Sequence, residues 1–159
     1  MWNNSSGFAV RFVLTVWLET LFDSSISLIT EMLEKDRRKT RQRAAIREAF
    51  ERCARPLSPQ QVLDAAQAEA EGLGIATVYR NIKGLREEGW LSAVALPAGV
   101  TVYERAGKPH HHHFHCDQCS RVFELTGCIP NINRLAGRRF SVRCHELVLY
   151  GLCADCMAR

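Results

Sequence analysis

The chain has 159 residues, which is enough for one ordinary domain or two very small ones. Its hydrophobic fraction of 47% is normal for a folded chain and excludes wholesale disorder. The formal net charge of +4 at pH 7 favours anionic partners only mildly, so the positions of the charges say more than their sum.

The amino-terminal segment is apolar but too short and too charged to predict a membrane span. Its apolar run extends from Phe8 to Phe22, and residues 1–7 contain no base of the kind that opens a signal peptide. Met32 stands directly before a basic run. We therefore predict that residues 1–31 are an over-extended reading frame or a poorly ordered extension, inside an extension domain of residues 1–35. We also predict a cytoplasmic protein with no membrane partner.

Three helices are predicted next. The run from Asp36 to Arg43 holds five bases and one acid, and apolar residues recur at helical spacing over residues 40–53. Ser58-Pro59-Gln60-Gln61 predicts the start of a second helix, with Ser58 as N-cap, Pro in the first turn and Gln three residues after the cap. The third helix is predicted over residues 75–88, and Gly89 ends it.

A hairpin follows the helices. Residues 90–96 and 100–104 alternate like two short strands, and Pro97-Ala98-Gly99 joins them. Three helices and a hairpin are the outline of a winged helix-turn-helix. We predict this domain over residues 36–106, a hinge at residues 107–109 and a second domain over residues 110–159.

The second domain is predicted to be small and mixed in structure. We expect a strand over residues 121–125, a short helix over residues 130–136, and one or two strands between Phe140 and Tyr150. A core of roughly fifty residues is marginal without a cross-link, a metal or a partner subunit.

Four of the seven cysteines form two Cys-x-x-Cys pairs: Cys116 with Cys119, and Cys153 with Cys156. Without a convincing secretory signal, these pairs favour a reducing compartment and metal ligation. Two such pairs let four thiolates converge on Zn(II), so we predict a structural zinc whose binding is coupled to folding. Four independent buried thiols are one alternative. A redox pair is less favoured, because neither pair is expected at the strand-to-helix junction of a βαβ unit.

A histidine run, His110 to His113, leads through Phe114 and His115 into Cys116. In an extended segment successive side chains point to opposite faces, so His111 and His113 face one way and His110 and His112 the other. The segment can therefore give two ligands to each of two metal sites, and a surface histidine run is the alternative. Imidazole suits Zn(II), Fe(II), Mn(II) or Ni(II), so the ligand type does not choose the metal.

Three motifs, in this order, resemble the ferric-uptake-regulator family. Residues 74–81, Gly-Ile-Ala-Thr-Val-Tyr-Arg-Asn, resemble its recognition helix. Residues 110–119, followed by 149–153 and Cys156, resemble its dimerisation domain. The resemblance covers about residues 39–156. It implies an α+β fold, in which an N-terminal winged helix-turn-helix DNA-binding domain precedes a small α/β zinc-containing dimerisation domain. It also implies a homodimer that binds a double-stranded DNA operator.

The resemblance implies which residues contact DNA. Tyr79 and Arg80 match the family's DNA-contacting pair, and Thr77 lies on the same helix. Arg80 can reach a guanine edge or a phosphate, and Tyr79 can contact thymine methyls. The alternative is a core Tyr79 beside a merely solvated Arg80. The remaining candidates would lie against phosphates: Lys39, Arg41 and Arg43.

The resemblance also implies a regulatory metal site between the domains. Its matching positions are Glu104, His111, His113 and Glu124. The family often adds a histidine from the loop before the second helix, where this chain has Arg55-Pro56, which cannot ligate. Cys53 lies close by in the sequence and is a conceivable substitute, although a small buried thiol is the simpler interpretation.

A second candidate site would use His110, His112 and His145. Its usual acidic ligand aligns near Asn131, a poorer donor. Cys128 and Cys144 match no position that the resemblance assigns.

The regulatory metal is predicted to be zinc, with Fe(II) or Mn(II) as alternatives. The unbroken histidine run resembles zinc-uptake regulators, whereas iron-sensing relatives usually carry an aspartate at the place of His112. Against zinc, Glu104 with Glu124 resembles the iron- and peroxide-sensing branches. We predict a metal-responsive repressor of metal uptake without enzymatic activity. Other hypotheses are an iron-, manganese- or peroxide-sensing repressor, a zinc-dependent hydrolase and an intracellular metal buffer.

Overall fold

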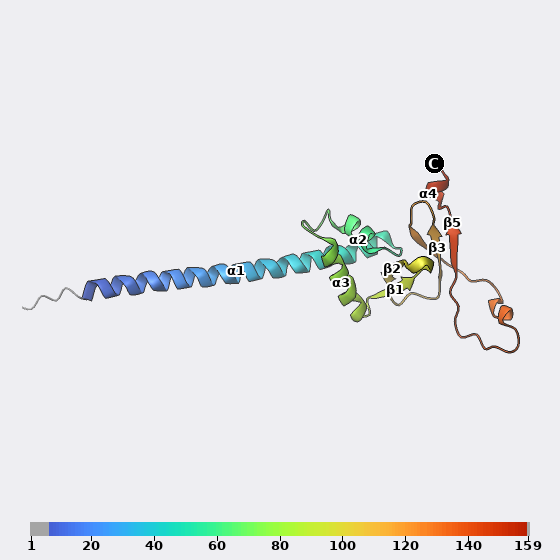
Figure 1. Cartoon of the computed structure of the whole chain (residues 1–159), viewed down its shortest axis with the longest axis horizontal. Coiled ribbons are helices and arrows are strands. Elements are labelled where there is room, and N and C mark those ends of the chain that lie inside the picture. The colour runs from blue at the N-terminus through green and yellow to red at the C-terminus, as the bar shows by residue number, and fades with distance from the viewer. Residues whose placement is uncertain (1–6, 159) are drawn as a thin grey trace, which may run out of the picture. The chain divides into compact units, whose positions relative to one another are not determined.

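The computed structural model describes the backbone of residues 7–158 and, except for Ala98, the side chains of residues 26–158 (Figure 1). Internal contacts divide the chain into two units, one ending at Arg41 and the other beginning at Gln42. The predicted hinge at residues 107–109 lies inside the second unit. A domain boundary at this hinge therefore stays a prediction.

The first helix, α1, is much longer than predicted, because it spans Gly7–Cys53 rather than beginning at residue 40. No Gly or Pro, the residues that most disfavour helix, stands inside it. From Gly7 to Glu31 the backbone is helical, and the prediction that this extension is poorly ordered stays a prediction. A native start near Met32 stays a prediction, and residues 1–6 lie outside the described residues. Among the described residues, no helix is both long and apolar enough to cross a membrane.

Helix α2 (Pro59–Ala66) begins where predicted, and helix α3 (Ile75–Glu87) begins and ends almost as predicted. The capping box is confirmed. The Gln61 backbone N–H donates to Ser58 Oγ over 3.3 Å, and the Ser58 backbone N–H donates to Gln61 Oε1 over 3.2 Å. Gly89 follows α3 with a φ of +72°, a conformation that glycine adopts without steric cost.

The largest core lies among α2, α3 and the part of α1 that belongs to the second unit. Phe50 of α1 is 2% exposed and meets Trp90 edge-on, with 6.2 Å between ring centroids. Leucine, isoleucine and valine side chains from all three helices fill the rest, among them Ile46, Val62, Val78, Ile82 and Leu85. The helical spacing of apolar residues that predicted the helix over residues 40–53 therefore corresponds to its buried face.

The predicted hairpin is present as the wing. Strand β1 (Leu91–Ala95) pairs antiparallel with β2 (Thr101–Arg105), and a 3₁₀ turn, Pro97–Gly99, connects them. Leu57 pairs with Tyr103 through a backbone hydrogen bond of 2.8 Å, which ties the wing to the connection between α1 and α2. Glu104 faces inward on β2 and is 5% exposed.

The second half is built on a three-stranded sheet in the order β4-β3-β5. Strand β3 (His112–Cys116) runs antiparallel to β4 (Val122–Leu125) and parallel to β5 (Val148–Gly151). Leu96 and Val102 of the wing share a small core with Val122 of β4. This contact holds the end of the wing beside the sheet.

Two predictions for the second half need correction, and one helix was not foreseen. Residues 130–136 form a 3₁₀ helix, Ile132–Ala136, rather than an ordinary short helix. Only the end of residues 140–150 is a strand, because the preceding side chains have no face to bury, and Phe140 is 72% exposed. A four-residue helix, α4 (Ala154–Met157), was not predicted. The predicted α+β class is nevertheless confirmed.

Candidate metal centres and nucleic-acid interface

The four cysteines of the two Cys-x-x-Cys pairs lie together. The sulfur atoms of Cys116, Cys119, Cys153 and Cys156 are all within 4.8 Å of one another. A tetrahedron with Zn–S bonds of about 2.3 Å sets neighbouring sulfurs about 3.8 Å apart. The Cys119 and Cys153 sulfurs are 3.8 Å apart, so the cluster has the dimensions of a zinc site.

Strand pairing brings these cysteines together. Cys116 ends β3 opposite Gly151 of β5, and the chain turns back through Ser120, whose φ is +55°. Cys153 is the N-cap of α4, and Cys156 lies within that helix. The second pair therefore lies where β5 leads into α4. The junction is not part of a βαβ unit, and the pair faces the other two thiols.

The electrostatics differ between the thiols of this cluster. Backbone N–H groups, that of Cys119 foremost, lower the pKa of the Cys116 thiol to about 6. One of these groups, the Cys153 N–H, donates to Cys116 Sγ over 3.3 Å. Burial raises the pKa of the Cys156 thiol to about 12. Backbone donors thus favour a thiolate at Cys116, whereas Cys156 needs a cation to become one.

A second cluster joins the wing to the histidine run. Ligand atoms of Glu104, His111 and His113 lie within 4.8 Å of one another. His111 Nε2 is 3.2 Å and His113 Nε2 is 3.6 Å from Glu104 Oε2. Burial alone raises the pKa of Glu104, but the nearby His113 imidazole and the charges of His111 and Lys108 lower it overall. The carboxylate is therefore ready to bind a cation.

Glu124 does not join these ligand atoms. Its carboxylate pairs with the Lys108 ammonium, which also lies 3.6 Å from Glu104 Oε2. Lys108 thus stands between two of the predicted ligands as a tethered cation. The sequence offered a signal, because Lys108 lies in the predicted hinge four residues after Glu104, but we did not assign it a role.

The third cluster contains all three predicted histidines and one cysteine. Ligand atoms of His110, His112, His145 and Cys128 lie within 4.8 Å of one another. Asn131, the position that aligns with an acidic ligand, is the N-cap residue of the 3₁₀ helix and has a φ of +60°. Cys128 is the ligand candidate that sequence reasoning missed.

Buried imidazole nitrogens support metal binding at the last two clusters. Both ring nitrogens of His112, and Nε2 of His113, are buried without a hydrogen-bond partner among the described residues. Most buried polar atoms in folded proteins have a partner. Nitrogens aimed at other ligand atoms, with no partner of their own, fit a divalent cation. The His115 Nδ1 atom also lacks a hydrogen-bond partner among the described residues, but it lies 3.9 Å from Asp117 Oδ1 and belongs to none of these clusters.

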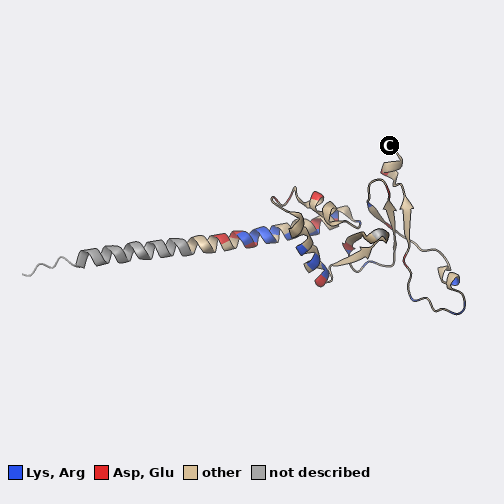
Figure 2. Cartoon of the chain, in the orientation of Figure 1, with Lys and Arg blue, Asp and Glu red and all other residues tan. Residues whose placement is uncertain are grey.

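The exposed face of α3 carries the predicted DNA-contacting residues. Figure 2 shows basic residues along α3 and along α1 around residues 37–43. Tyr79 is 52% exposed, which rules out the alternative of a core tyrosine. Arg80 is exposed too, and its guanidinium donates to Thr77 Oγ1 over 3.1 Å.

The three other basic candidates differ in their surroundings. Arg43 forms an ion pair with Glu88, just beyond the end of α3, so its guanidinium is already engaged and would have to leave Glu88 to bind a phosphate. Lys39 is exposed and lies 3.5 Å from Asp36. Arg41 is exposed as well.

Comparisons with known proteins agree with the motifs. The model of the "Ferric uptake regulator family" matches residues 34–150. The ferric uptake regulation protein of Campylobacter upsaliensis is 34% identical over 100 residues, which cover 59% of this chain and 63% of that protein, less than two thirds of its length. The zinc uptake regulation protein of Mycobacterium tuberculosis is 31% identical over 124 residues, covering 75% of this chain and 94% of that protein.

Solved structures agree on the fold. A structure of the ferric uptake regulator from Francisella tularensis with iron has a TM-score of 0.58 and 27% identity, and covers 73% of this chain and 91% of that chain. Because the family model spans most of the sequence, this chain belongs to the ferric uptake regulator family.

Proposed function

We propose that this chain is a metal-responsive, DNA-binding transcriptional repressor that acts as a cytoplasmic homodimer, with zinc as its favoured regulatory metal. The observation that carries the proposal is the cluster of Glu104 with His111 and His113. Glu104 belongs to the wing, and the two histidines belong to the second half. A cation shared by these ligands would supply a positive charge that draws the two parts together.

The proposed response to metal follows from the contacts that Glu104 makes with and without a bound cation. Without a shared cation, Glu104 is held by the histidine nitrogens and by Lys108. With one, the wing and β3 are joined by charge-assisted bonds across the predicted hinge. An effector shifts a conformational equilibrium only by its difference in affinity between the two states. The geometry supports such a difference, because the three ligands converge only when the wing lies beside the sheet.

The reading surface is α3, with Tyr79 and Arg80 directed to bases and Thr77 beside them. Both leading side chains are exposed, and the Thr77 hydroxyl orients the Arg80 guanidinium. Basic side chains in α1 would contribute contacts to phosphates, which position a protein on DNA without specifying sequence.

A homodimer is supported by the second half. Strand β5 lies at an edge of its sheet, and an edge strand offers unpaired backbone groups to a second chain. Apolar side chains on or next to this strand are exposed: Leu149, Tyr150 and Leu152. Dimers with two recognition helices read half-sites that repeat along the major groove.

Zinc is favoured over iron on the histidine run and on the likeness to the Mycobacterium tuberculosis zinc uptake regulation protein. The chain is also similar to the Francisella tularensis regulator, whose structure was solved with iron, so Fe(II) is the competing candidate for the regulatory metal. Glu104 with two imidazoles accepts either cation, so the choice needs a measurement.

The test is DNA-binding anisotropy of the protein with its structural zinc retained, on a palindromic AT-rich operator candidate. Free Zn(II), Fe(II) and Mn(II) are titrated separately. We expect steep binding at a much lower free concentration of zinc than of the others. Activation by Fe(II) or Mn(II) instead would move the protein to the iron, manganese or peroxide branch. Tight binding that ignores every metal would remove the sensing claim and leave the DNA-binding claim.

A pair of variants tests the reading helix. Arg80→Ala should abolish specific operator binding while the zinc content stays unchanged. Arg134→Ala removes the same charge from the exposed 3₁₀ helix of the second half and serves as the matched control. Normal operator affinity in Arg80→Ala would refute the assignment.

A further inference from the structure

The loop between β4 and β5 meets the histidine strand at both of its ends. Cys128 lies three residues after β4, and His145 lies three residues before β5. Both reach His110 and His112 at the start of β3, and the four ligand atoms lie within 4.8 Å of one another. Residues far apart in the sequence therefore converge on one point.

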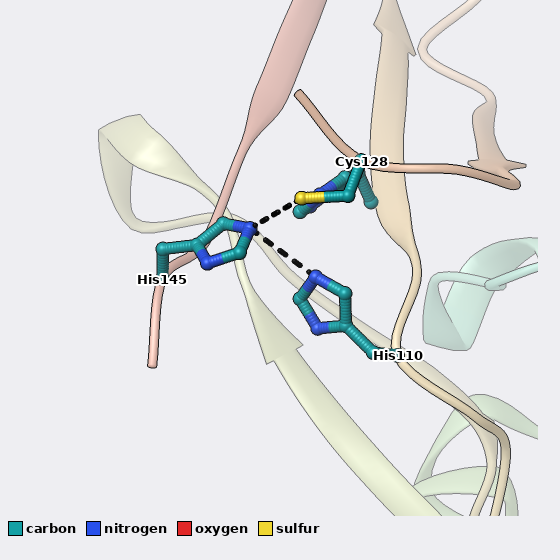
Figure 3. Close-up of side chains that lie close together, drawn as sticks. His110, Cys128 and His145 are labelled. Atoms are coloured by element: carbon teal, nitrogen blue, oxygen red, sulfur yellow. Dashed lines mark hydrogen bonds between the residues drawn. The ribbon is translucent and has the colours of Figure 1, made fainter. Parts of the chain in front are cut away.

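The spacing of these atoms approaches that of a tetrahedral site. In Figure 3, Nε2 of His145 is directed at both the Cys128 sulfur and the His110 ring. The two histidine Nε2 atoms are 3.2 Å apart. A tetrahedron with Zn–N bonds of about 2.0–2.1 Å sets them about 3.3–3.4 Å apart. The Cys128 sulfur lies 3.0 Å from His145 Nε2. It must move back by about half an ångström to reach the tetrahedral separation of about 3.6 Å.

The fourth member of the cluster supplies an independent sign of a ligand. His112 is 3% exposed, and neither of its ring nitrogens has a hydrogen-bond partner among the described residues. Its ring packs against His110 and His145, with centroids 4.6 Å and 5.0 Å away. A buried imidazole that faces two other imidazoles and a thiol is satisfied when all four share a cation.

We propose that Cys128 completes a closed four-ligand zinc site with His110, His112 and His145, in which its thiolate selects Zn(II) over Fe(II) and Mn(II). As the metal–sulfur bond forms, the S–H bond breaks and the proton leaves to solvent. Thiolate is a soft ligand that favours zinc, whereas carboxylate and water suit manganese. With three histidines and a cysteine, the site has no open position, as in structural zinc sites.

The site also has a structural consequence. It pins both ends of residues 126–147, which carry little regular structure and expose Phe140 and Leu135. Zinc at this site is therefore expected to protect the loop from hydrogen exchange and proteolysis. The inference does not depend on DNA binding by α3.

Cobalt spectroscopy of the full chain tests the proposal. The four-cysteine site is first filled with zinc, and Co(II) is then titrated anaerobically. A sulfur-to-cobalt charge-transfer band in the near ultraviolet then reports a further thiolate, because the cluster of Glu104 has no sulfur ligand. We expect the band in the wild type and its loss on addition of Zn(II).

Matched variants identify the thiolate. Cys128→Ser should remove the band and weaken zinc binding at this site by at least about tenfold, the lower end of losses measured for residues that only support metal ligands. Cys144→Ser changes another exposed cysteine, next to His145 but outside the cluster, and should keep the band. A band that survives in Cys128→Ser, or no band in the wild type, would overturn the proposal.

A third variant tests metal selection. Cys128→Asp keeps an anionic ligand but replaces sulfur with oxygen. The preference for Zn(II) over Mn(II), measured by competition, should then fall by at least about tenfold, because the harder carboxylate oxygen suits Mn(II) better than a thiolate does. An unchanged preference would show that the thiolate does not select the metal. Retention of zinc by the four-cysteine site in each variant controls for folding.

Discussion

Removal of the Lys108 ammonium is expected to raise the affinity of the regulatory cluster for metal. Lys108 pairs with Glu124 and lies 3.6 Å from Glu104 Oε2. A cation bound by Glu104 must work against this tethered charge and displace it. Lys108→Met removes the charge and keeps an unbranched chain of similar length, so the carboxylates remain in place without their internal cation.

The size of the effect follows from the burial of the three groups. The side chains of Lys108 and Glu124 are 24% and 23% exposed, and that of Glu104 is 7% exposed. A hydrogen bond to a charged group at such a site contributes about 1.5–3 kcal/mol. Since about 1.4 kcal/mol corresponds to a factor of ten, Lys108→Met should tighten metal binding about 10- to 100-fold.

The assay is competition for Zn(II) with a chromophoric chelator, with the four-cysteine site kept loaded. The binding step that disappears in Glu104→Ala identifies the cluster. Lys108→Arg, which keeps the charge, should leave that step close to wild type. Lys83→Met removes an exposed lysine of α3 and controls for the change in net charge. Unchanged or weaker binding in Lys108→Met would refute the view that Lys108 competes with metal.

Three further predictions concern stability. Phe50→Ala should lower the free energy of unfolding by about 3–5 kcal/mol in urea at fixed zinc, because the ring fills the largest core; a loss below about 1 kcal/mol would contradict its place there. Ser58→Ala removes one half of the capping box and should cost about 1 kcal/mol, seen as a lower Tm, whereas an unchanged Tm would mean that the cap contributes nothing. Chelation of the structural zinc, or Cys119→Ser, should make the second half sensitive to protease while the helical core stays protected, and equal resistance of both halves would argue against folding coupled to zinc.

Several elements were predictable because their causes are local. The capping box at Ser58 involves residues only three apart, and the wing is formed by two alternating runs around a short turn. The two faces of the histidine run follow from the period of an extended chain. In the structure His111 and His113 meet Glu104, whereas His110 and His112 meet His145.

Other features escaped prediction because no local pattern marks them. Helix α1 extends back to Gly7. Its apolar side chains from Ile26 to Leu33 are exposed, so this part of the helix has no buried face that a sequence pattern could indicate. The segment before β5 looked like a strand because it mixes apolar and polar residues, but residues 140–147 form no strand of either sheet.

By itself, the sequence determined the pairing of the cysteines and the two-sided geometry of the histidine strand, because both depend on spacing along an extended or turning backbone. Tertiary structure alone decided which distant groups complete the clusters. Cys128 reaches His145 because strands β4 and β5 flank β3 and bring the two ends of one loop together. Glu124 pairs with Lys108 rather than joining the cluster of Glu104, His111 and His113, because the wing packs beside the sheet. Spacing sets the direction of a side chain, whereas packing of separate elements sets its neighbours.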